Sequence, residues 1–497
     1  MKALLMHRDH DFDRQHELPF DAEALIQDLE LNTLFNAMAC GDRFLFEVAK
    51  VAVLSPSTDI DTIIYRQNIL KDCLNNPSLV RNMYKIVIEA IESEKKNYWS
   101  IFVKHPEAIL NRSVDVLGML MGMLRKLRTV ADEHAGKFGS AGFRAFFAML
   151  QKDLDDEYFA TVQNHLNYLK FHQGILIAAA LGPGNKGTDY MLCRPPDRTP
   201  GWIERVFTRQ PRYYTFTLDD RDEAGFRALA ELRDRGLNPA ADALARSADH
   251  ILAFLAMLRA ELAFYVGCLN LYDQLTAKTM PVSFPLPAPA GERRHSCRGL
   301  YDVGLALTME EKVVPNDLSA DGKRLVLITG ANRGGKSTFL RSVGLAQLMM
   351  QCGMFVPAES FAANVCDGLF THYQREEDPA MTSGKFDEEL ARMSAIVDHL
   401  RPGSLLLCNE SFAATNEREG SEIAAQIVRA LVEKGIKVFF VSHMYEFARG
   451  WYDRHMDYAV FLRAERQGDA TRTFRIVEGE PLPTSFGRDL YDRIFVD

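Results

Sequence analysis

The sequence has no closely spaced pair of cysteines. Its 8 cysteines are scattered along 497 residues, and none stands in a Cys-x-x-Cys pattern. Structural zinc sites and disulfide-rich secreted domains both need such spacing, so neither class is indicated. Scattered cysteines without such spacing are typical of proteins in a reducing compartment, and we expect the protein to be cytoplasmic.

Long apolar runs are also missing. A membrane helix needs ~18 or more consecutive apolar residues. Residues 251–271 come near this length but are interrupted by Arg259 and Glu261, and the apolar start, Met1 to Met6, is too short for a signal peptide. We therefore expect no membrane partner.

The chain has no excess of basic residues. Lys and Arg number 58 against 67 Asp and Glu, for a formal net charge of −9. Attraction of nucleic acid over the whole surface would need the opposite balance. Any nucleic-acid contact must therefore come from a local basic patch.

The first half of the chain is helical in pattern. Apolar residues within 244–269 recur every three or four positions, which predicts one long helix with a seam against a partner. Length alone suggests about three units, at ~100–200 residues per domain. We expect a helical connector or core domain over 1–125 and lever helices over 126–278.

Two features interrupt this helical half. Short β-type runs at 174–179 and 213–218, separated by turn residues, predict a clamp-like insertion at about 170–217. Four prolines within 281–289 favour an extended linker, where we place the main domain boundary. From 279 to 497 β-type runs alternate with helical patterns, which predicts a mostly parallel sheet.

A glycine-rich segment follows the first apolar run of this last domain. Residues 325–329 have strand character, 330–337 read GANRGGKS, and a helical pattern begins at Thr338. This is the context of a P-loop, in which we expect Lys336 to reach the β and γ phosphates of ATP and Ser337 to bind Mg²⁺. Three glycines let backbone N–H groups face the phosphates: Gly330, Gly334 and Gly335.

Two later strands end in polar residues. The run 405–408 is followed by Asn409 and Glu410, and the run 437–441 by Ser442 and His443. Glu410 is the candidate base that orients the attacking water, with an ordinary strand-end carboxylate as the alternative. Asn409 replaces the usual acidic residue near Mg²⁺, and His443 is either a γ-phosphate sensor or a structural hydrogen-bonding residue.

Together these stretches resemble the MutS family of DNA mismatch-repair ATPases. The resemblance rests on GANRGGKST, on the segment 339–360 that ends in Val-Pro-Ala-Glu-Ser, on 314–318, on Phe370-Thr371 and on Ser442-His443. It implies a fold of α + α/β class, in which a long-helix lever and clamp half precedes a P-loop, ABC-like ATPase domain.

The resemblance also implies roles for individual residues. Lys336, Glu410 and His443 would act on the γ-phosphate. Ser383 is the best counterpart of the signature serine that faces a second subunit's nucleotide, so a homodimer with composite ATP sites is expected. The remaining residues expected at ATP or Mg²⁺ are Gly330, Asn332, Gly334, Gly335, Ser337, Thr338 and Asn409.

The sequence departs from the family at several points. Ser411 to Thr415 replaces a glycine-rich loop of the family. Gly384-Lys385-Phe386 does not match, residue for residue, the family's ABC-like signature segment. The chain contains one Phe-x-Glu, at Phe386, inside the expected ATPase half rather than in an N-terminal mismatch-reading domain. We therefore expect a divergent, shortened member that does not read mispairs by the usual wedge.

One basic segment is a candidate for double-stranded or branched DNA. Arginines alternate there with aromatic residues, which could pair phosphates and stack on bases, or cover a small core as a solvated surface. Its arginines are Arg194, Arg198, Arg205, Arg209 and Arg212.

The sequence thus predicts an ATPase that switches a dimeric clamp on DNA, in mismatch repair or a related repair or recombination process. Two alternatives stay open. One is a ribosome- or RNA-handling relative. The other is an ATP-binding scaffold with little hydrolysis, which Asn409 favours.

Overall fold

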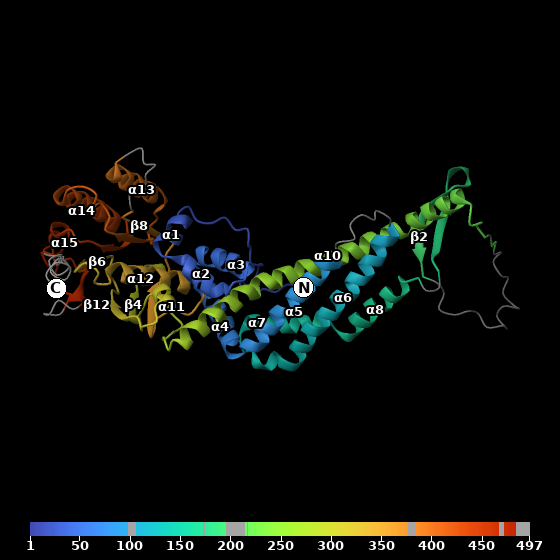
Figure 1. Ribbon diagram of the computed structural model, residues 1–497, viewed down its shortest axis with the longest axis horizontal. Coiled ribbons are helices and arrows are strands. Elements are labelled where there is room, and N and C mark those ends of the chain that lie inside the picture. The colour runs from blue at the N-terminus through green and yellow to red at the C-terminus, as the bar shows by residue number, and fades with distance from the viewer. Residues whose placement is uncertain are drawn as a thin grey trace. The chain divides into compact units, whose positions relative to one another are not determined.

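The computed structural model has α + α/β character, with long helices and mixed sheets (Figure 1). It divides into two compact units, each made of separate chain segments. The first unit comprises 1–3, 81–138 and 144–259, and the second 4–80, 139–143 and 260–497. The structure describes residues 1–97, 106–171, 174–194, 214–215, 217–375, 384–466 and 472–483.

The first unit is built from long helices and one β-hairpin. The helix predicted from the spacing of residues 244–269 is confirmed, and it begins earlier than that pattern does. Its elements are α5 (Pro77–Asn97) from residue 81 onward, α6 (Pro106–His134), η2 (Ala135–Lys137), α7 (Ala141–Asp153) from residue 144, α8 (Asp156–Tyr168), β1 (Leu176–Leu181), η3 (Pro183–Asn185), β2 (Gly187–Cys193) and α10 (Glu223–Ala277) up to residue 259.

The hairpin lies where the insertion was expected, between α8 and α10. Strand β1 pairs antiparallel with β2. The second predicted run, 213–218, is wrong as far as it is described, because residues 214, 215, 217 and 218 lie in no strand. A β-rich composition forms a strand only where a neighbouring strand pairs with it, and the described residues offer this segment none.

The second unit begins with four short helices, two of them capped by aspartate. Asp42 accepts hydrogen bonds from the backbone of Phe44 and Leu45, and Asp59 from that of Thr62, which satisfies free N–H groups of the first turn. The four helices are α1 (Ala22–Asp28), α2 (Leu31–Ala39), α3 (Arg43–Leu54) and α4 (Ile60–Asn75). They pack with the C-terminal part of the chain, as α3 and α4 contact α12. The division into 1–125, 126–278 and 279–497 stays a prediction.

A six-stranded sheet forms the centre of the second unit. Its order is β12-β11-β6-β10-β9-β8, and every neighbouring pair is parallel except β11 with β12. The strands are β6 (Leu325–Gly330), β8 (Leu369–Tyr373), β9 (Leu405–Asn409), β10 (Lys437–Val441), β11 (Ala459–Arg466) and β12 (Arg472–Glu478). The helices that connect them are α12 (Lys336–Gln351), α13 (Lys385–His399), α14 (Glu417–Glu433) and α15 (Tyr445–Tyr452).

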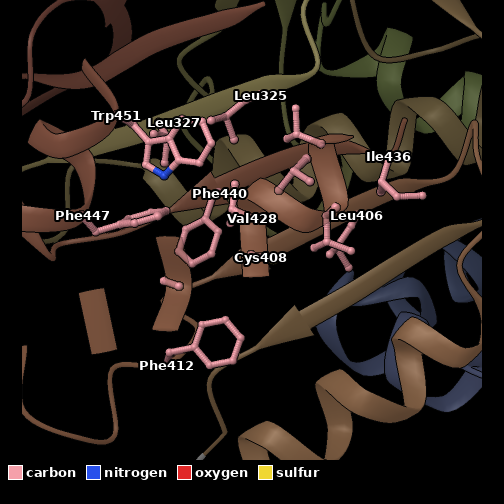
Figure 2. Packing of buried hydrophobic residues seen from close by; sticks show 14 of the residues in the cluster. Leu325, Leu327, Leu406, Cys408, Phe412, Val428, Ile436, Phe440, Phe447 and Trp451 are labelled. Atoms are coloured by element: carbon pink, nitrogen blue, oxygen red, sulfur yellow. The ribbon is translucent and has the colours of Figure 1, made fainter. Parts of the chain in front are cut away.

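Helices cover both faces of this sheet. On one face Leu406 and Cys408 join a buried cluster with Val428 of α14 and Trp451 of α15 (Figure 2). On the other face α12 packs so closely that a Cβ at Gly344 would lie 2.7 Å from Cδ1 of Leu407. Strands buried on both faces read as continuous apolar runs, which is why these strands were visible in the sequence.

A second, four-stranded sheet of order β3-β7-β4-β5 corrects one expectation. The proline-rich join was predicted as a linker, yet Leu286 to Ala288 pairs with β7 as a parallel strand. Proline is tolerated there because β3 is an edge strand. The elements are β3 (Leu286–Ala288), η4 (Ala290–Glu292), β4 (His295–Leu300), α11 (Val303–Thr308), β5 (Asn316–Ser319) and β7 (Ser360–Asn364).

Among the described residues, one helix is long and apolar enough to cross a membrane by length and composition. It is α10, and 72% of its most apolar window is buried inside the protein. A mostly buried core helix meets the same criteria of length and composition.

Candidate active site

Three strands of the large sheet end beside one another and carry the predicted site residues. Ile328 of β6 is in register with Val441 of β10, which is in register with Asn409 of β9. The backbone of Glu410 donates to the carbonyl of Val441 at 2.9 Å. Ligand sites in open parallel sheets form at such carboxyl ends.

The lysine and serine that open α12 contact this edge differently. The Nζ of Lys336 donates to the carbonyls of Gly330 and Ala331, at 3.1 Å each, and the side chain is buried. Burial lowers the pKa of Lys336, while Glu410 opposes that shift. The hydroxyl of Ser337 donates to Oδ1 of Asn409 at 2.9 Å. The loop, the helix start and β9 therefore converge on one small volume.

The loop before α12 needs its glycines. Gly330 and Gly335 have φ of +108° and +89°, which L side chains rarely adopt. A Cβ on Gly334 would lie 2.8 Å from the carbonyl oxygen of Ala331. The backbone of this loop therefore takes a path that side chains at Gly330, Gly334 and Gly335 would obstruct or strain.

Replacing Gly330 with alanine should distort this loop. The new Cβ would lie 2.8 Å from the backbone nitrogen of Ala464, and the positive φ adds strain, for a cost of about 1–3 kcal/mol. We expect a lower melting temperature and weaker ATP binding by calorimetry. Gly322→Ala is the matched control, because its φ is +75° but no atom lies within 4 Å. Equal losses in both variants would contradict a special role for the loop.

Glu410 and His443 form an ion pair at the same edge. Oε2 of Glu410 lies 3.5 Å from Nδ1 of His443. The hydrogen bond with His443 lowers the pKa of Glu410, and the same contact raises the pKa of His443. Glu410 therefore stays ionised at neutral pH and can accept a hydrogen bond from a water or from His443.

Two cavities of the second unit flank the glycine-rich loop. One, of about 380 Å³, is mainly apolar and is lined by residues that include Tyr301, Val314, Phe339 and Phe474. The other, of about 670 Å³, is mainly polar and includes Ser337, Asn409, Arg341 and Arg375. One side of the loop thus suits a planar apolar group and the other a charged group.

The structure adds residues that the sequence analysis missed. The Nε of Arg472 donates to the backbone oxygen of Asn332 at 3.1 Å and so ties β12 to the loop. Asn316 accepts from the backbone of Ile476 at 2.6 Å, which joins the two sheets beside the apolar cavity. The signal available for Asn316 was its place in the segment 314–318. Arg472 carried no recognisable pattern.

The remaining predicted residues lie at the loop, in the first unit or outside the described part of the chain. Arg194 is exposed in the first unit, with its guanidinium carbon 4.1 Å from the ring centroid of Tyr168. Thr338 opens onto both cavities, and Asn332 is half-buried in the loop. The residues outside the described part of the chain are Arg198, Arg205, Arg209, Arg212 and Ser383.

Comparison with known proteins fits this geometry. Residues 58–278 match the MutS2 N-terminal domain, and residues 326–491 match MutS domain V. The chain belongs to the MutS family. The second match begins in β6 and includes the loop, Asn409, Glu410 and His443, so this MutS-family chain has its candidate site within domain V.

Curated relatives agree over parts of the chain. A protein named DNA mismatch repair protein MutS from Thermotoga neapolitana is 35% identical over 179 residues, 35% of this chain and 22% of the relative. The protein of the same name from Lactobacillus helveticus is 29% identical over 266 residues, which are 50% of this chain and 30% of the relative. The one from Thermotoga sp. strain RQ2 is 39% identical over 137 residues, which are 27% of this chain and 17% of the relative. The chain thus spans less than a third of these relatives.

Proposed function

We propose that this MutS-family chain binds and hydrolyses ATP at the carboxyl edge of the large sheet and couples that cycle to DNA binding. One observation carries the proposal. The loop lysine, the Ser337–Asn409 hydrogen bond and the Glu410–His443 pair all lie at one sheet edge, as phosphoryl transfer requires. Chemistry of this kind depends mainly on positioning and on charge.

Each residue would have a distinct role. The ammonium of Lys336, now bonded to two loop carbonyls, would turn to the β and γ phosphates of ATP. Glu410 would orient the attacking water, and His443 would hold that carboxylate and contact the γ-phosphate. The apolar cavity beside Phe339 and Phe474 would take the adenine ring.

Ser337 and Asn409 fit a magnesium site of reduced charge. Both offer hard oxygen ligands, and their mutual hydrogen bond shows that they reach the same point. Mg²⁺, when bound, neutralises charge on the phosphate oxygens. Asn409 supplies no negative charge, so its oxygen would position the metal's ligands without attracting the ion.

Asn409→Asp should therefore strengthen the metal site. The aspartate can still accept from Ser337, and its charge should lower the half-saturating Mg²⁺ concentration for ATP turnover roughly tenfold. Asn409→Ala, which loses the acceptor, should raise that concentration. A magnesium titration of phosphate release measures both. If the aspartate variant needs as much Mg²⁺ as the wild type, Asn409 is not at the metal.

The DNA partner would contact the first unit. We propose that the hairpin region and the five arginines from Arg194 to Arg212 contribute a local basic grip, which the net charge of −9 makes necessary. A cytoplasmic homodimer with composite ATP sites, to which Ser383 contributes, completes the proposal. Nucleotide state would switch the long helices of the first unit between different grips on DNA, as in other nucleotide-driven switches.

The partner can be tested by binding curves with homoduplex, mismatched and four-way-junction DNA, each with and without ATP, and with ribosomes in parallel. We expect ATP-dependent DNA binding that weakens and loses salt dependence when Arg205, Arg209 and Arg212 are changed together to alanine. Binding to ribosomes alone would favour the RNA-handling alternative. DNA binding unchanged by the triple variant would show that the basic segment does not hold DNA.

A further inference from the structure

The second unit has a basic pocket at the edge of the sheet opposite the candidate active site. Arg324 precedes β6 and Lys437 begins β10, whereas the active-site residues follow the carboxyl ends of these strands. Strands of five or six residues at ~3.3 Å per residue separate the two edges by about 16–20 Å. The pocket is therefore a separate place on the protein.

Its ionisable lining is entirely cationic among the described residues. A cavity of about 410 Å³ is lined by no carboxylate and by four half-buried cationic side chains. These are Arg293, Lys323, Arg324 and Lys437. A cavity of this size lies in the usual ~300–1,000 Å³ range of small-molecule sites. Cations gathered in this way repel one another unless an anion joins them.

The side chains show this mutual repulsion and incomplete pairing. Partial burial and the neighbouring Arg324 lower the pKa of Arg293. Burial lowers the pKa of Lys437 to about 8, with Asp321 opposing and Arg293 adding to the shift. The buried Nε of Arg324 has no hydrogen-bond partner in the described part of the chain.

The backbone around the cations leaves room for a ligand. Gly291, Gly403 and Gly435 line the pocket without side chains. A Cβ on Gly291 would meet no atom within 4 Å. Lys323 and Lys437 are held in place by acceptors, namely the backbone oxygen of Asp457 at 2.6 Å and Oδ1 of Asn364 at 2.9 Å. The charges are thus preorganised around an open space.

We propose that this pocket binds an anion carrying two adjacent phosphate groups. Forked guanidinium groups and ammonium groups are the donors that recognise phosphate oxygens. The two phosphates can belong to a free diphosphate or to consecutive phosphodiesters of a nucleic-acid strand. The inference does not depend on ATP hydrolysis at the other edge.

The test uses the full chain carrying Lys336→Met, which weakens diphosphate binding at the glycine-rich loop. Inorganic pyrophosphate and a short oligothymidylate are titrated separately by calorimetry. Adding Arg293→Gln and Arg324→Gln should raise the dissociation constant of the bound probe at least about tenfold. Lys434→Gln, an exposed lysine outside the pocket, is the matched control and should change it less than about twofold.

A second variant distinguishes a loss of binding from a loss of folding. Gly291→Glu places a carboxylate at the open rim without a clash, and it should weaken the same probe while leaving the melting temperature unchanged. Loss of pyrophosphate binding identifies a free diphosphate, and loss of oligonucleotide binding alone identifies a strand backbone. If neither probe binds, or if both bind equally well to all variants, the proposal is overturned.

Discussion

Glu410→Gln should lower the rate of ATP hydrolysis by about a hundredfold or more while leaving ATP binding intact. Glutamine keeps the shape of the side chain but loses the charge that pairs with His443 at 3.5 Å. The amide oxygen of glutamine can still accept a hydrogen bond from the water but cannot take up its proton, whereas Lys336 and Ser337 would keep their contacts with ATP. Single-turnover phosphate release measures the rate, and equilibrium binding of an ATP analogue measures the affinity.

The matched control for this variant is Glu446→Gln. Glu446 is exposed in the first turn of α15, three residues beyond His443. The substitution Glu446→Gln therefore removes the same charge from the same part of the protein. Its turnover should equal that of the wild type. Full hydrolysis by Glu410→Gln would contradict the assignment of the base. A wild type without turnover would favour the scaffold alternative that Asn409 suggests.

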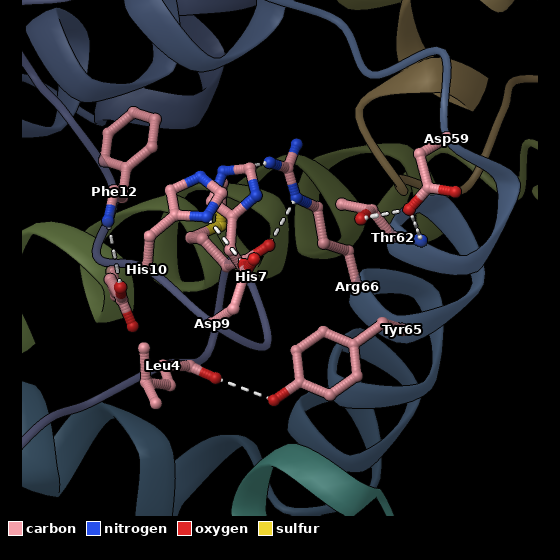
Figure 3. A network of polar contacts seen from close by, with 11 residues as sticks. Leu4, His7, Asp9, His10, Phe12, Asp59, Thr62, Tyr65 and Arg66 are labelled. Atoms are coloured by element: carbon pink, nitrogen blue, oxygen red, sulfur yellow. Dashed lines mark hydrogen bonds and ion pairs between the residues drawn. The ribbon is translucent and has the colours of Figure 1, made fainter.

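The second large effect concerns the buried carboxylate of Glu261 in the second unit. It accepts hydrogen bonds from the backbone of Leu5 at 2.6 Å and Phe12 at 3.2 Å, and it is fully buried. Figure 3 shows the same N-terminal segment held by Tyr65, whose hydroxyl donates to Leu4, and by Arg66. Burial raises the pKa of Glu261 from 4.5 to about 7, with Asp11 adding to the shift.

Stability relative to a glutamine variant should therefore depend on pH. The raised pKa means that Glu261 favours the folded state when protonated, below pH 4.5, and that this contribution is lost as pH rises through about 7. Glu261→Gln stays neutral at every pH. Its one amide oxygen can replace only one of the two carboxylate oxygens, which accept separately from Leu5 and Phe12, so the variant loses one hydrogen bond by the same amount at each pH. Its free energy of unfolding, minus that of the wild type, should rise by about 3 kcal/mol between pH 4.5 and 8.

Urea denaturation of both proteins across this pH range measures the difference. Subtraction cancels other groups, including His7, whose pKa is lowered to about 4 by burial and Arg66. Glu433→Gln, an exposed carboxylate of α14, is the control and should give a flat difference. A flat difference for Glu261→Gln would show that its carboxyl titrates as in the unfolded chain.

The sequence was informative where structure is local. The apolar runs before Gly330, Asn409 and Ser442 predicted β6, β9 and β10, because strands buried on both faces show uninterrupted apolar residues. The long helix α10 followed from its helical spacing. The four-stranded sheet was not predicted, since Leu286–Ala288 lies among prolines and is a strand only through its pairing with β7.

Contacts between distant segments were also beyond the sequence. The thiol of Cys352 donates to the carbonyl of Ala52 at 3.3 Å, and Glu261 holds Leu5, yet no periodic pattern links these positions. At the site, the strand ends predicted which residues would meet. The hydrogen bond from Arg472 to Asn332 depends on the antiparallel pairing of β12 with β11, so it could be found only from the three-dimensional structure.

The proposed function depends first on nucleotide binding by the loop at Gly330 to Ser337. Equilibrium binding of Mg²⁺–ATP to the full chain tests it most directly, with Lys336→Met compared against the exposed control Lys434→Met. We expect saturable binding by the wild type and the control, and at least about tenfold weaker binding by Lys336→Met. Equal affinity in all three proteins, or no binding by the wild type, would contradict it.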